Sequence, residues 1–331
     1  EFAVELKDLR VEFRAPGKRI EAVNGVDLQL RQGEVVALIG ESGSGKSVTL
    51  RTVMRLHPER HTRITGTLAV NGKNVLGMNP RALADLRGKE VAMIFQEPLL
   101  ALDPVYTVGA QIIEAIRRHE GVSPADARAR ALALFEKVRI PSPERRLAAY
   151  PHELSGGMRQ RAMIALALAC NPKVLLADEP TTALDATVQI QILLLLRELQ
   201  RDLGLSVIFV THDIGAAVEV ADRIAVMYAG RIVEEGTARD LILAPRHPYT
   251  IALLKSRAHG AMTRGTRLET IGGSPPDLSA LPPGCAFAAR CSLATDACRA
   301  AQPPAVEVSP GHHARCIRTD AAAAIAPMMV T

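Results

Sequence analysis

The residues best suited to chemistry form the stretch Gly-Glu-Ser-Gly-Ser-Gly-Lys-Ser at positions 40–47. It follows the apolar run 35–39 and precedes a segment with helical spacing. Glycines let the backbone approach a phosphate chain closely, and the amides of a helix N-terminus bind its negative charge. Lys46 would add a point charge for the β- and γ-phosphates, and the Ser47 hydroxyl would bind Mg²⁺. The residues expected to bind the phosphate chain are Gly40, Glu41, Ser42, Gly43, Ser44, Gly45, Lys46, Ser47 and Val48.

Two adjacent carboxylates, Asp178 and Glu179, end the apolar run 174–177. Uncompensated buried charge is costly, so packing alone does not explain two acids at the tip of a buried strand. Asp178 is expected to hold Mg²⁺, and Glu179 to polarise the hydrolytic water as general base. A further acid, Asp185, stands near the start of the next helical segment.

Two other polar residues follow buried strands, Gln96 after 91–95 and His212 after 206–211. Because ligands bind at the carboxyl ends of strands in open α/β sheets, Gln96 is expected to reach the metal or the attacking water. His212 is expected to contact the γ-phosphate, although a lone histidine at a strand end is usually structural. Phe13 lies upstream of the phosphate loop, where its ring could stack on a base; a strand phenylalanine is more often part of the core.

A second anion site is predicted at Ser155, Gly156 and Gly157, directly before an Ala- and Leu-rich helix. Such a turn exposes amide groups at the positive end of the helix dipole. One chain that binds one nucleotide has no evident need for two sites of this kind.

The elements that position these residues alternate between strand and helix patterns. Residues 2–32 predict two strands joined by a turn at Pro16-Gly17, and Asn71-Gly72 marks another hairpin. The hydrophobic periodicity of residues 98–169 predicts helices. Strands are expected again at 174–178, 206–211, 223–228 and 231–234.

Composition narrows the classes of protein. The 331 residues are 48% hydrophobic and only 3% aromatic, without Trp, so a stacking platform for single-stranded nucleic acid is not expected. The net charge of +5 is spread along the chain without a basic block, and no nucleic-acid partner is predicted. Neither a membrane-spanning run nor a signal-peptide pattern is apparent, which predicts a cytosolic chain.

Taken together, these motifs resemble those of ATP-binding cassette (ABC) ATPases, in the order and at the approximate spacing of that family. The resembling segments are Gly40–Ser47 (Walker A), Gln96 (Q-loop), Leu154–Arg161 (signature), Val174–Glu179 (Walker B), Thr182–Asp185 (D-loop) and His212 (switch histidine). In this family two cassettes pack head to tail, so that the signature of one completes the ATP site of the other. The resemblance therefore accounts for the second anion site, and it places Phe13 near the adenine.

The C-terminal part resembles the extension found in the ATPase subunits of oligopeptide and dipeptide importers. The similarity rests on the segment 245–254 and on the tail 282–316. The segment 99–104 departs from the family, since small hydroxylated residues are expected there and Leu-Leu-Ala-Leu-Asp-Pro stands instead. That region meets the membrane subunits in the family.

The resemblance implies an α/β fold, a P-loop NTPase cassette of the ABC type with a mixed sheet, an antiparallel β subdomain and a helical insert at about 98–169. The cassette would span 1–244. A small irregular extension that contains a cysteine cluster would span 245–320, and 321–331 is expected to be a disordered tail.

The function implied is that of an ATPase coupled to peptide import, with ATP and Mg²⁺ as cofactors, at the cytoplasmic face of the cell membrane. Expected partners are a second cassette, two integral membrane permease subunits and an extracytoplasmic substrate-binding protein. The alternatives are an importer subunit for nickel chelates or other small solutes, a soluble ABC ATPase acting on ribosomes or DNA, and a regulatory metal-sensing module. The soluble class usually has two cassettes in one chain or long coiled-coil insertions, and this chain has neither.

Four of the five cysteines are clustered near the C-terminus, at Cys285, Cys291, Cys298 and Cys316. Clustered thiols in a reducing cytosol suggest a metal site. The lack of a C-x-x-C pair weakens a zinc-ribbon interpretation, whereas four thiolates on a loop-rich segment suit a [4Fe–4S] cluster, which some members resembling this chain carry. Zinc and metal-free thiols are alternatives. His312 and His313 could substitute as ligands, but are interpreted as ordinary surface histidines, and Cys170 as part of the core.

Overall fold

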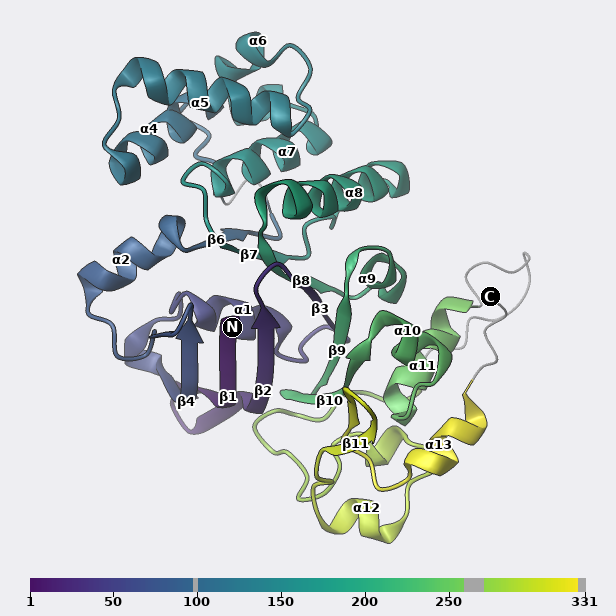
Figure 1. Ribbon diagram of the computed structural model, residues 1–331. Coiled ribbons are helices and arrows are strands. Elements are labelled where there is room, and N and C mark those ends of the chain that lie inside the picture. Colours follow the sequence, from purple (N-terminus) through teal and green to yellow (C-terminus); the bar gives the residue numbers. More distant parts are fainter. Residues whose placement is uncertain (98–100, 259–270, 327–331) are drawn as a thin grey trace. The chain divides into compact units, whose positions relative to one another are not determined.

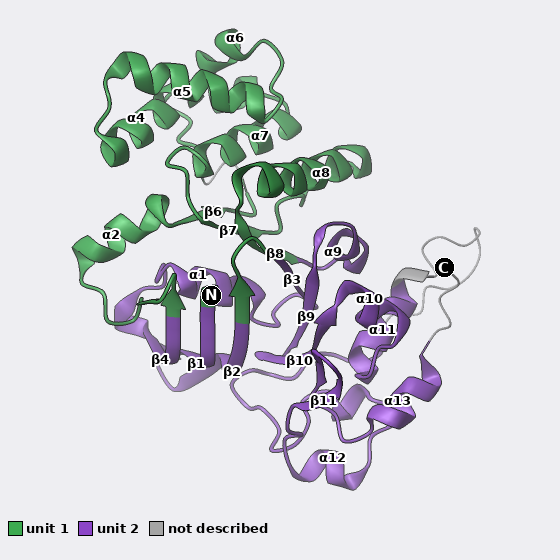
Figure 2. Cartoon of the chain, in the orientation of Figure 1, with its two compact units in different colours: residues 1–4, 29–34, 69–210 green, residues 5–28, 35–68, 211–331 purple. Residues whose placement is uncertain are grey.

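The computed structural model describes residues 1–97, 101–258 and 271–326 (Figure 1). The chain divides into two compact units, each built from several stretches of sequence (Figure 2). Unit 1 comprises Glu1–Val4, Gln29–Glu34 and Ala69–Val210, and unit 2 comprises Glu5–Leu28, Val35–Leu68 and Thr211–Thr331.

Unit 1 contains three parallel strands, β6 (Val91–Ile94), β7 (Val174–Asp178) and β8 (Ser206–Thr211), except for the last residue of β8, which belongs to unit 2. Every residue of the three strands is buried. A parallel sheet covered on both faces requires continuous apolar runs rather than alternation, and this is the pattern that the sequence shows here. The carboxyl ends of the three strands therefore share one edge, where the polar residues at 96 and 178–179 follow.

The region expected to be helical forms most of the rest of unit 1. Its core includes Ile112, Ile116 and Phe135, which are fully buried. Thr107 and Ser123 cap two of the helices, and Gly121 ends the first of these with a left-handed residue. The helices of unit 1 are α2 (Pro80–Lys89), α4 (Val108–Glu120), α5 (Pro124–Lys137), α6 (Pro143–Leu147), η2 (Pro151–Glu153), α7 (Gly156–Ala167) and α8 (Ala186–Leu203). Residues 98–100 of the proposed insert, and so part of the divergent segment 99–104, lie outside the described residues.

Unit 2 contains a mixed sheet in the order β11-β12-β10-β9-β3. The strands β3 and β9 are parallel, and the remaining neighbours are antiparallel. The strands are β3 (Val35–Ile39), β9 (Arg223–Tyr228), β10 (Arg231–Thr237), β11 (Val306–Ser309) and β12 (His312–Ala314).

A second, four-stranded sheet has the order β2-β1-β4-β5, with its greater part in unit 2. Both turns predicted from the sequence are present, one between β1 and β2 and one at Asn71-Gly72, whose φ angles of 46° and 75° suit a type I′ hairpin. The strands are β1 (Phe2–Ala15), β2 (Lys18–Arg31), β4 (Thr62–Val70) and β5 (Lys73–Asn74). The helices of unit 2 are α1 (Lys46–Val53), η1 (Glu59–His61), α9 (Ile214–Val220), α10 (Ala238–Leu243), α11 (Pro248–Ala258), η4 (Ala288–Arg290), α12 (Asp296–Ala300) and α13 (Thr319–Ile325).

The C-terminal extension is more regular than its sequence suggests. Its strand β12 pairs with β10, where Glu234 lies opposite Ala314. The buried Glu234 side chain accepts hydrogen bonds from the amides of Arg246 (2.6 Å) and His247 (2.9 Å) and lies 2.8 Å from His312 Nε2. The interpretation of His312 as a surface residue is therefore wrong, because its ring nitrogen has a hydrogen-bond partner in the core.

The helix α13 differs from the expected disorder of 321–331. It includes the alanines at 321–324, which have the highest helix propensity, and it buries Ala322 fully. Residues 327–331 lie outside the described part. Within the three described ranges, no helix is both long and apolar enough to cross a membrane.

Candidate functional site

The phosphate loop of unit 2 joins the buried strand β3 to helix α1. Two of its glycines stand where no side chain fits. A Cβ atom on Gly40 would lie 2.2 Å from the carbonyl oxygen of Met227, and one on Gly45 would lie 2.4 Å from that of Ala22. Gly45 also has a φ of 103°, which L-residues rarely adopt. The glycine spacing is thus required by the close approach of neighbouring backbone.

We expect Gly45→Ala to lower the free energy of unfolding by about 2–4 kcal/mol, because left-handed strain adds to a backbone clash. Gly43→Ala is the matched control: Gly43 has a φ of 79°, but no atom lies within 4 Å of its added Cβ, so about 1–2 kcal/mol is expected. Urea unfolding of both variants measures the difference. Equal losses would show that the approach of Ala22 does not constrain the loop.

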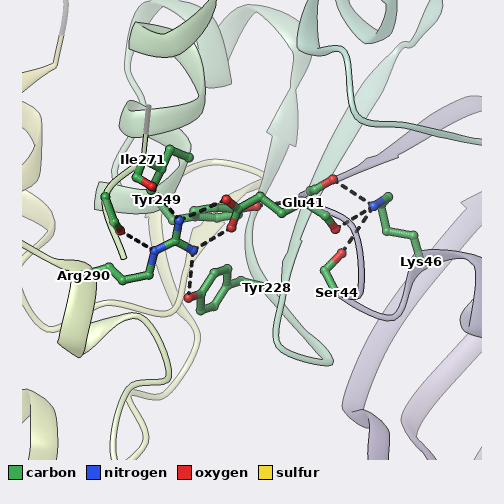
Figure 3. Close-up of polar contacts among 9 residues, drawn as sticks. Glu41, Ser44, Lys46, Tyr228, Tyr249, Ile271 and Arg290 are labelled. Atoms are coloured by element: carbon green, nitrogen blue, oxygen red, sulfur yellow. Dashed lines mark hydrogen bonds and ion pairs between the residues drawn. The ribbon is translucent and has the colours of Figure 1, made fainter. Parts of the chain in front are cut away.

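Lys46 is the first residue of α1, and its side chain turns back over the loop (Figure 3). Its Nζ donates hydrogen bonds to the carbonyl oxygens of Gly40 (2.8 Å) and Glu41 (2.9 Å). The residue is only 4% exposed. The ammonium group is therefore held at the centre of a loop whose backbone precedes a helix N-terminus, the arrangement that binds phosphate.

The turn between β9 and β10 forms a hydrogen bond with the same loop. The amide of Gly230 donates to the carbonyl oxygen of Ser44 (2.9 Å), and the carbonyl oxygen of Gly230 accepts from the amide of Asn24 (2.8 Å). The loop is thus tied into the mixed sheet by main-chain hydrogen bonds.

Phe13 lies on β1 and is half-buried, with the ring of His57 edge-on at a centroid distance of 5.2 Å. His57 Nε2 is 3.1 Å from the carbonyl oxygen of Val48, in the first turn of α1. Burial lowers the pKa of His57, which keeps its ring neutral near pH 7. His57 therefore connects Phe13 to the helix that follows the phosphate loop, although its sequence neighbours carry no signal of that contact.

His212 follows β8 directly and is exposed. The next residue, Asp213, caps α9, since its Oδ1 accepts a hydrogen bond from the amide of Gly215 (2.7 Å). The structure thus places His212 in the turn between a buried strand and a capped helix, at the strand end where the sequence predicts it.

Unit 1 brings together the residues that follow β6 and β7. Asp178 is fully buried as the last residue of β7. Glu179 Oε2 accepts hydrogen bonds from Gln96 Nε2 (3.2 Å) and Thr182 Oγ1 (2.9 Å). Glu179 has a φ of 44°, and positive φ in a residue other than glycine often marks a functional site. The two donors fix the orientation of the Glu179 carboxylate.

The Ser-Gly-Gly turn lies before α7 in the same unit. Ser155 is exposed and caps this helix, with its Oγ accepting from the amide of Met158 (3.3 Å). A Cβ atom on Gly157 would lie 3.0 Å from Val188 Cγ1 of α8, so the turn packs closely on the start of that helix. The exposed Asp185 caps α8 by accepting from the amide of Val188 (3.0 Å). The predicted signature turn and the predicted D-loop acid are therefore neighbours.

The four C-terminal cysteines, Cys285, Cys291, Cys298 and Cys316, line one pocket in unit 2. All five cysteines of the chain are free thiols. The amide of Cys285 donates to the carbonyl oxygen of Cys298 (2.7 Å), and burial raises the pKa of Cys316 to about 11. Cys170 is buried in the core of unit 1, as expected.

The donor set of this pocket does not suit a single ion. Within the described ranges, no three His, Cys, Asp or Glu side chains lie close enough together to hold one metal ion. The pairing of His312 with Glu234 also removes that histidine as a substitute ligand. A mononuclear zinc site is therefore not supported. The same arrangement of side chains gives no support for an iron–sulfur cluster, although the four thiols line one apolar pocket.

Two family models match the chain. Residues 23–182 match the family described as ABC transporter, and residues 233–298 match the oligopeptide/dipeptide transporter C-terminal region. The first match begins before the phosphate loop and ends just after Glu179. The second contains three of the four clustered cysteines.

Relatives with similar sequences extend over almost the whole chain. A putative peptide import ATP-binding protein of Brucella melitensis is 49% identical, over 95% of this chain and 96% of the relative. The oligopeptide transport ATP-binding protein OppD of Bacillus subtilis is 47% identical, over 94% of this chain and 87% of its own length. Neither name mentions an iron–sulfur cluster.

Solved structures agree with these matches. A bacterial ABC transporter cassette determined as a dimer is 30% identical, with a TM-score of 0.64, and covers 71% of this chain and 99% of its own. The same values hold for a dimeric post-hydrolysis state of that cassette bound to ADP and Pi. The predicted α/β cassette fold is confirmed. The chain therefore belongs to the ABC transporter family of ATPases, in the group that carries the oligopeptide/dipeptide transporter C-terminal region.

Proposed function

We propose that this chain is the ATP-hydrolysing subunit of an importer for oligopeptides or dipeptides. The observation that carries the proposal is the phosphate loop itself, in which Lys46 is buried and Gly40 and Gly45 leave no room for a side chain. The match of residues 233–298 to the peptide transporter C-terminal region supports the choice of cargo.

In the proposed mechanism, ATP with Mg²⁺ is the bound form. Lys46 and the loop amides would hold the β- and γ-phosphates, and Ser47, Gln96 and Asp178 would provide ligands for Mg²⁺ directly or through water. The buried carboxylate of Asp178 and the hydroxyl of Ser47 are the oxygen donors that this ion prefers. Glu179 accepts the proton of the attacking water, and His212 stabilises the γ-phosphate as charge develops on it.

The remaining residues of the proposed site bind the nucleotide from its edges. Phe13 stacks on the adenine. Ser155, Gly156 and Gly157 of a second cassette bind the γ-phosphate across the dimer, and Asp185 lies at that interface. Exposure of Ser155 and Asp185 supports a role outside their own cassette.

The proposed assembly contains a second cassette, two integral membrane permease subunits and an extracytoplasmic substrate-binding protein. The cassette spans 1–244, with the extension at 245–320, and the protein lies at the cytoplasmic face of the cell membrane. A two-fold or pseudo-two-fold pair closes on itself, which limits the assembly to two cassettes.

Purification of the intact complex under mild detergent, followed by mass analysis of its subunits, tests this assignment. The proposal expects integral membrane proteins and ATPase activity that rises when peptide and its binding protein are added. Recovery with ribosomes or DNA, and no membrane subunit, would contradict it.

We propose that the cysteine pocket holds a [4Fe–4S] cluster, which would stabilise the fold of the extension. We expect anaerobically purified protein to absorb near about 400 nm and to contain roughly four iron and four sulfide per chain. Cys298→Ser should lose most of the iron, whereas Cys170→Ser, the matched control in the core, should retain it. Metal-free wild-type protein, or equal iron in both variants, would contradict the cluster.

A further inference from the structure

Arg290, a residue of the extension, contacts the phosphate loop (Figure 3). Arg290 lies in η4, and its guanidinium forms a two-pronged ion pair with Glu41, the second residue of the loop. Nη1 lies 2.7 Å from Oε2, and Nη2 lies 3.0 Å from Oε1. The Arg290 side chain is 3% exposed and that of Glu41 27%. Two parallel charge-assisted hydrogen bonds of this kind fix both distance and orientation.

The guanidinium is held from its other sides as well. Its Nε donates to the carbonyl oxygen of Gly272 (2.8 Å), and Nη2 also donates to that of Ile271 (3.0 Å). Nη1 donates to the hydroxyl of Tyr228 (3.2 Å). Every guanidinium nitrogen therefore has a partner. The hydrogen bonds to Glu41 raise the pKa of Arg290, so its positive charge is permanent.

A second residue of the C-terminal segment holds the same loop position. The hydroxyl of Tyr249 accepts a hydrogen bond from the amide of Glu41 (2.7 Å), and its ring is fully buried against Tyr228, at a centroid distance of 4.6 Å. The carbonyl oxygen of Glu41 meanwhile accepts from Lys46 (2.9 Å). Glu41 is thus fixed through its side chain, its amide and its carbonyl group.

A carboxylate at this position conflicts with the proposed ligand. Glu41 belongs to the loop expected to hold a triphosphate, and two negative charges in a partly buried site repel each other more strongly than in water. A fixed cation next to the Glu41 carboxylate reduces that repulsion. Arg290 supplies one, from 249 positions away in the sequence.

We propose that Arg290 is a positioning residue of the nucleotide site: by neutralising Glu41 and orienting it, the cysteine-bearing extension makes the phosphate loop competent to bind ATP. The inference rests on the proposed function, because it assumes that the loop binds a nucleotide. According to this inference, the extension contributes to the affinity of the site for nucleotide.

The test measures the dissociation constant for a fluorescent ATP analogue with Mg²⁺ in the full chain. Arg290→Gln keeps hydrogen-bond donors but removes the charge, and we expect affinity to fall at least about tenfold. Arg290→Lys keeps the charge and should stay within about threefold of wild type. Adding Glu41→Gln to Arg290→Gln removes the repulsion and should restore most of the affinity.

The matched control is Arg299→Ala. Like Arg290, Arg299 adjoins a cysteine of the extension, but its ion pair is with Asp296 within its own helix, 3.5 Å away. It should bind ATP as wild type does. Thermal unfolding of each variant identifies any that do not fold. If Arg290→Gln does not fold, the dissociation constant of Arg290→Lys tests the proposal in its place.

Unchanged affinity in Arg290→Gln would overturn the proposal. So would a loss that Glu41→Gln does not rescue in a folded double variant, or an Arg290→Lys variant as weak as Arg290→Gln, since these results would indicate a purely structural contact. Failure of the proposed function looks different: wild type itself would then bind no nucleotide, or Lys46→Ala would bind as tightly as wild type.

Discussion

Glu179→Gln is expected to bind ATP as tightly as wild type and to hydrolyse it at least about a hundredfold more slowly, because loss of a general base typically costs about 10²–10⁴ in rate. The substitution keeps the size of the side chain, and its amide oxygen can still accept from Gln96 and Thr182. What it removes is the capacity to accept a proton. Single-turnover hydrolysis together with nucleotide binding separates the two effects.

The matched control is Glu198→Gln, which changes an exposed glutamate paired with Arg139 at 2.5 Å on the surface of the same unit. That variant should hydrolyse ATP at the wild-type rate. If Glu179→Gln also retained the wild-type rate, Glu179 would not be the base.

Lys46→Ala should weaken ATP binding by about a hundredfold or more. The ammonium group of this lysine lies within 2.9 Å of two loop carbonyl oxygens. A hydrogen bond to a charged group contributes about 1.5–3 kcal/mol, and in a buried loop it is poorly replaced by water. Titration with a fluorescent ATP analogue measures the loss, and circular dichroism establishes that the variant is folded.

Lys18→Ala is a suitable control for this charge deletion. Lys18 is exposed and lies 3.5 Å from Asp277, so its removal changes net charge equally without touching the loop. Its affinity for ATP should be unchanged. A Lys46→Ala protein that is folded and binds ATP normally would contradict the proposed phosphate site.

The parts of the fold that were predictable are those with local signals. The loop at 40–47 lies between an apolar run and a helical pattern, so its neighbours in sequence are also its neighbours in space. The same holds for the turn at Asn71-Gly72 and for Asp178 at the tip of β7. In each case, glycine spacing or burial along a few residues is enough to identify the element.

The parts that were missed depend on partners far away in the chain. The strand β11 alternates valine with polar residues over only four positions and is mostly exposed. The strand β12 is held by the pairing of His312 with Glu234, 78 positions earlier. The ion pair of Arg290 with Glu41 has no local signal at either residue. Polar contacts of this kind are specified by the folded arrangement and not by periodicity.

The account depends most on ATP being shared between two cassettes. The direct measurement is a structure of the Glu179→Gln protein trapped with ATP, Mg²⁺ and its second cassette. We predict that Lys46 of one cassette contacts the β- and γ-phosphates while Ser155 and the following glycine amides of the other contact the γ-phosphate. A nucleotide enclosed by one polypeptide, with Ser155, Gly156 and Gly157 facing solvent, would contradict it.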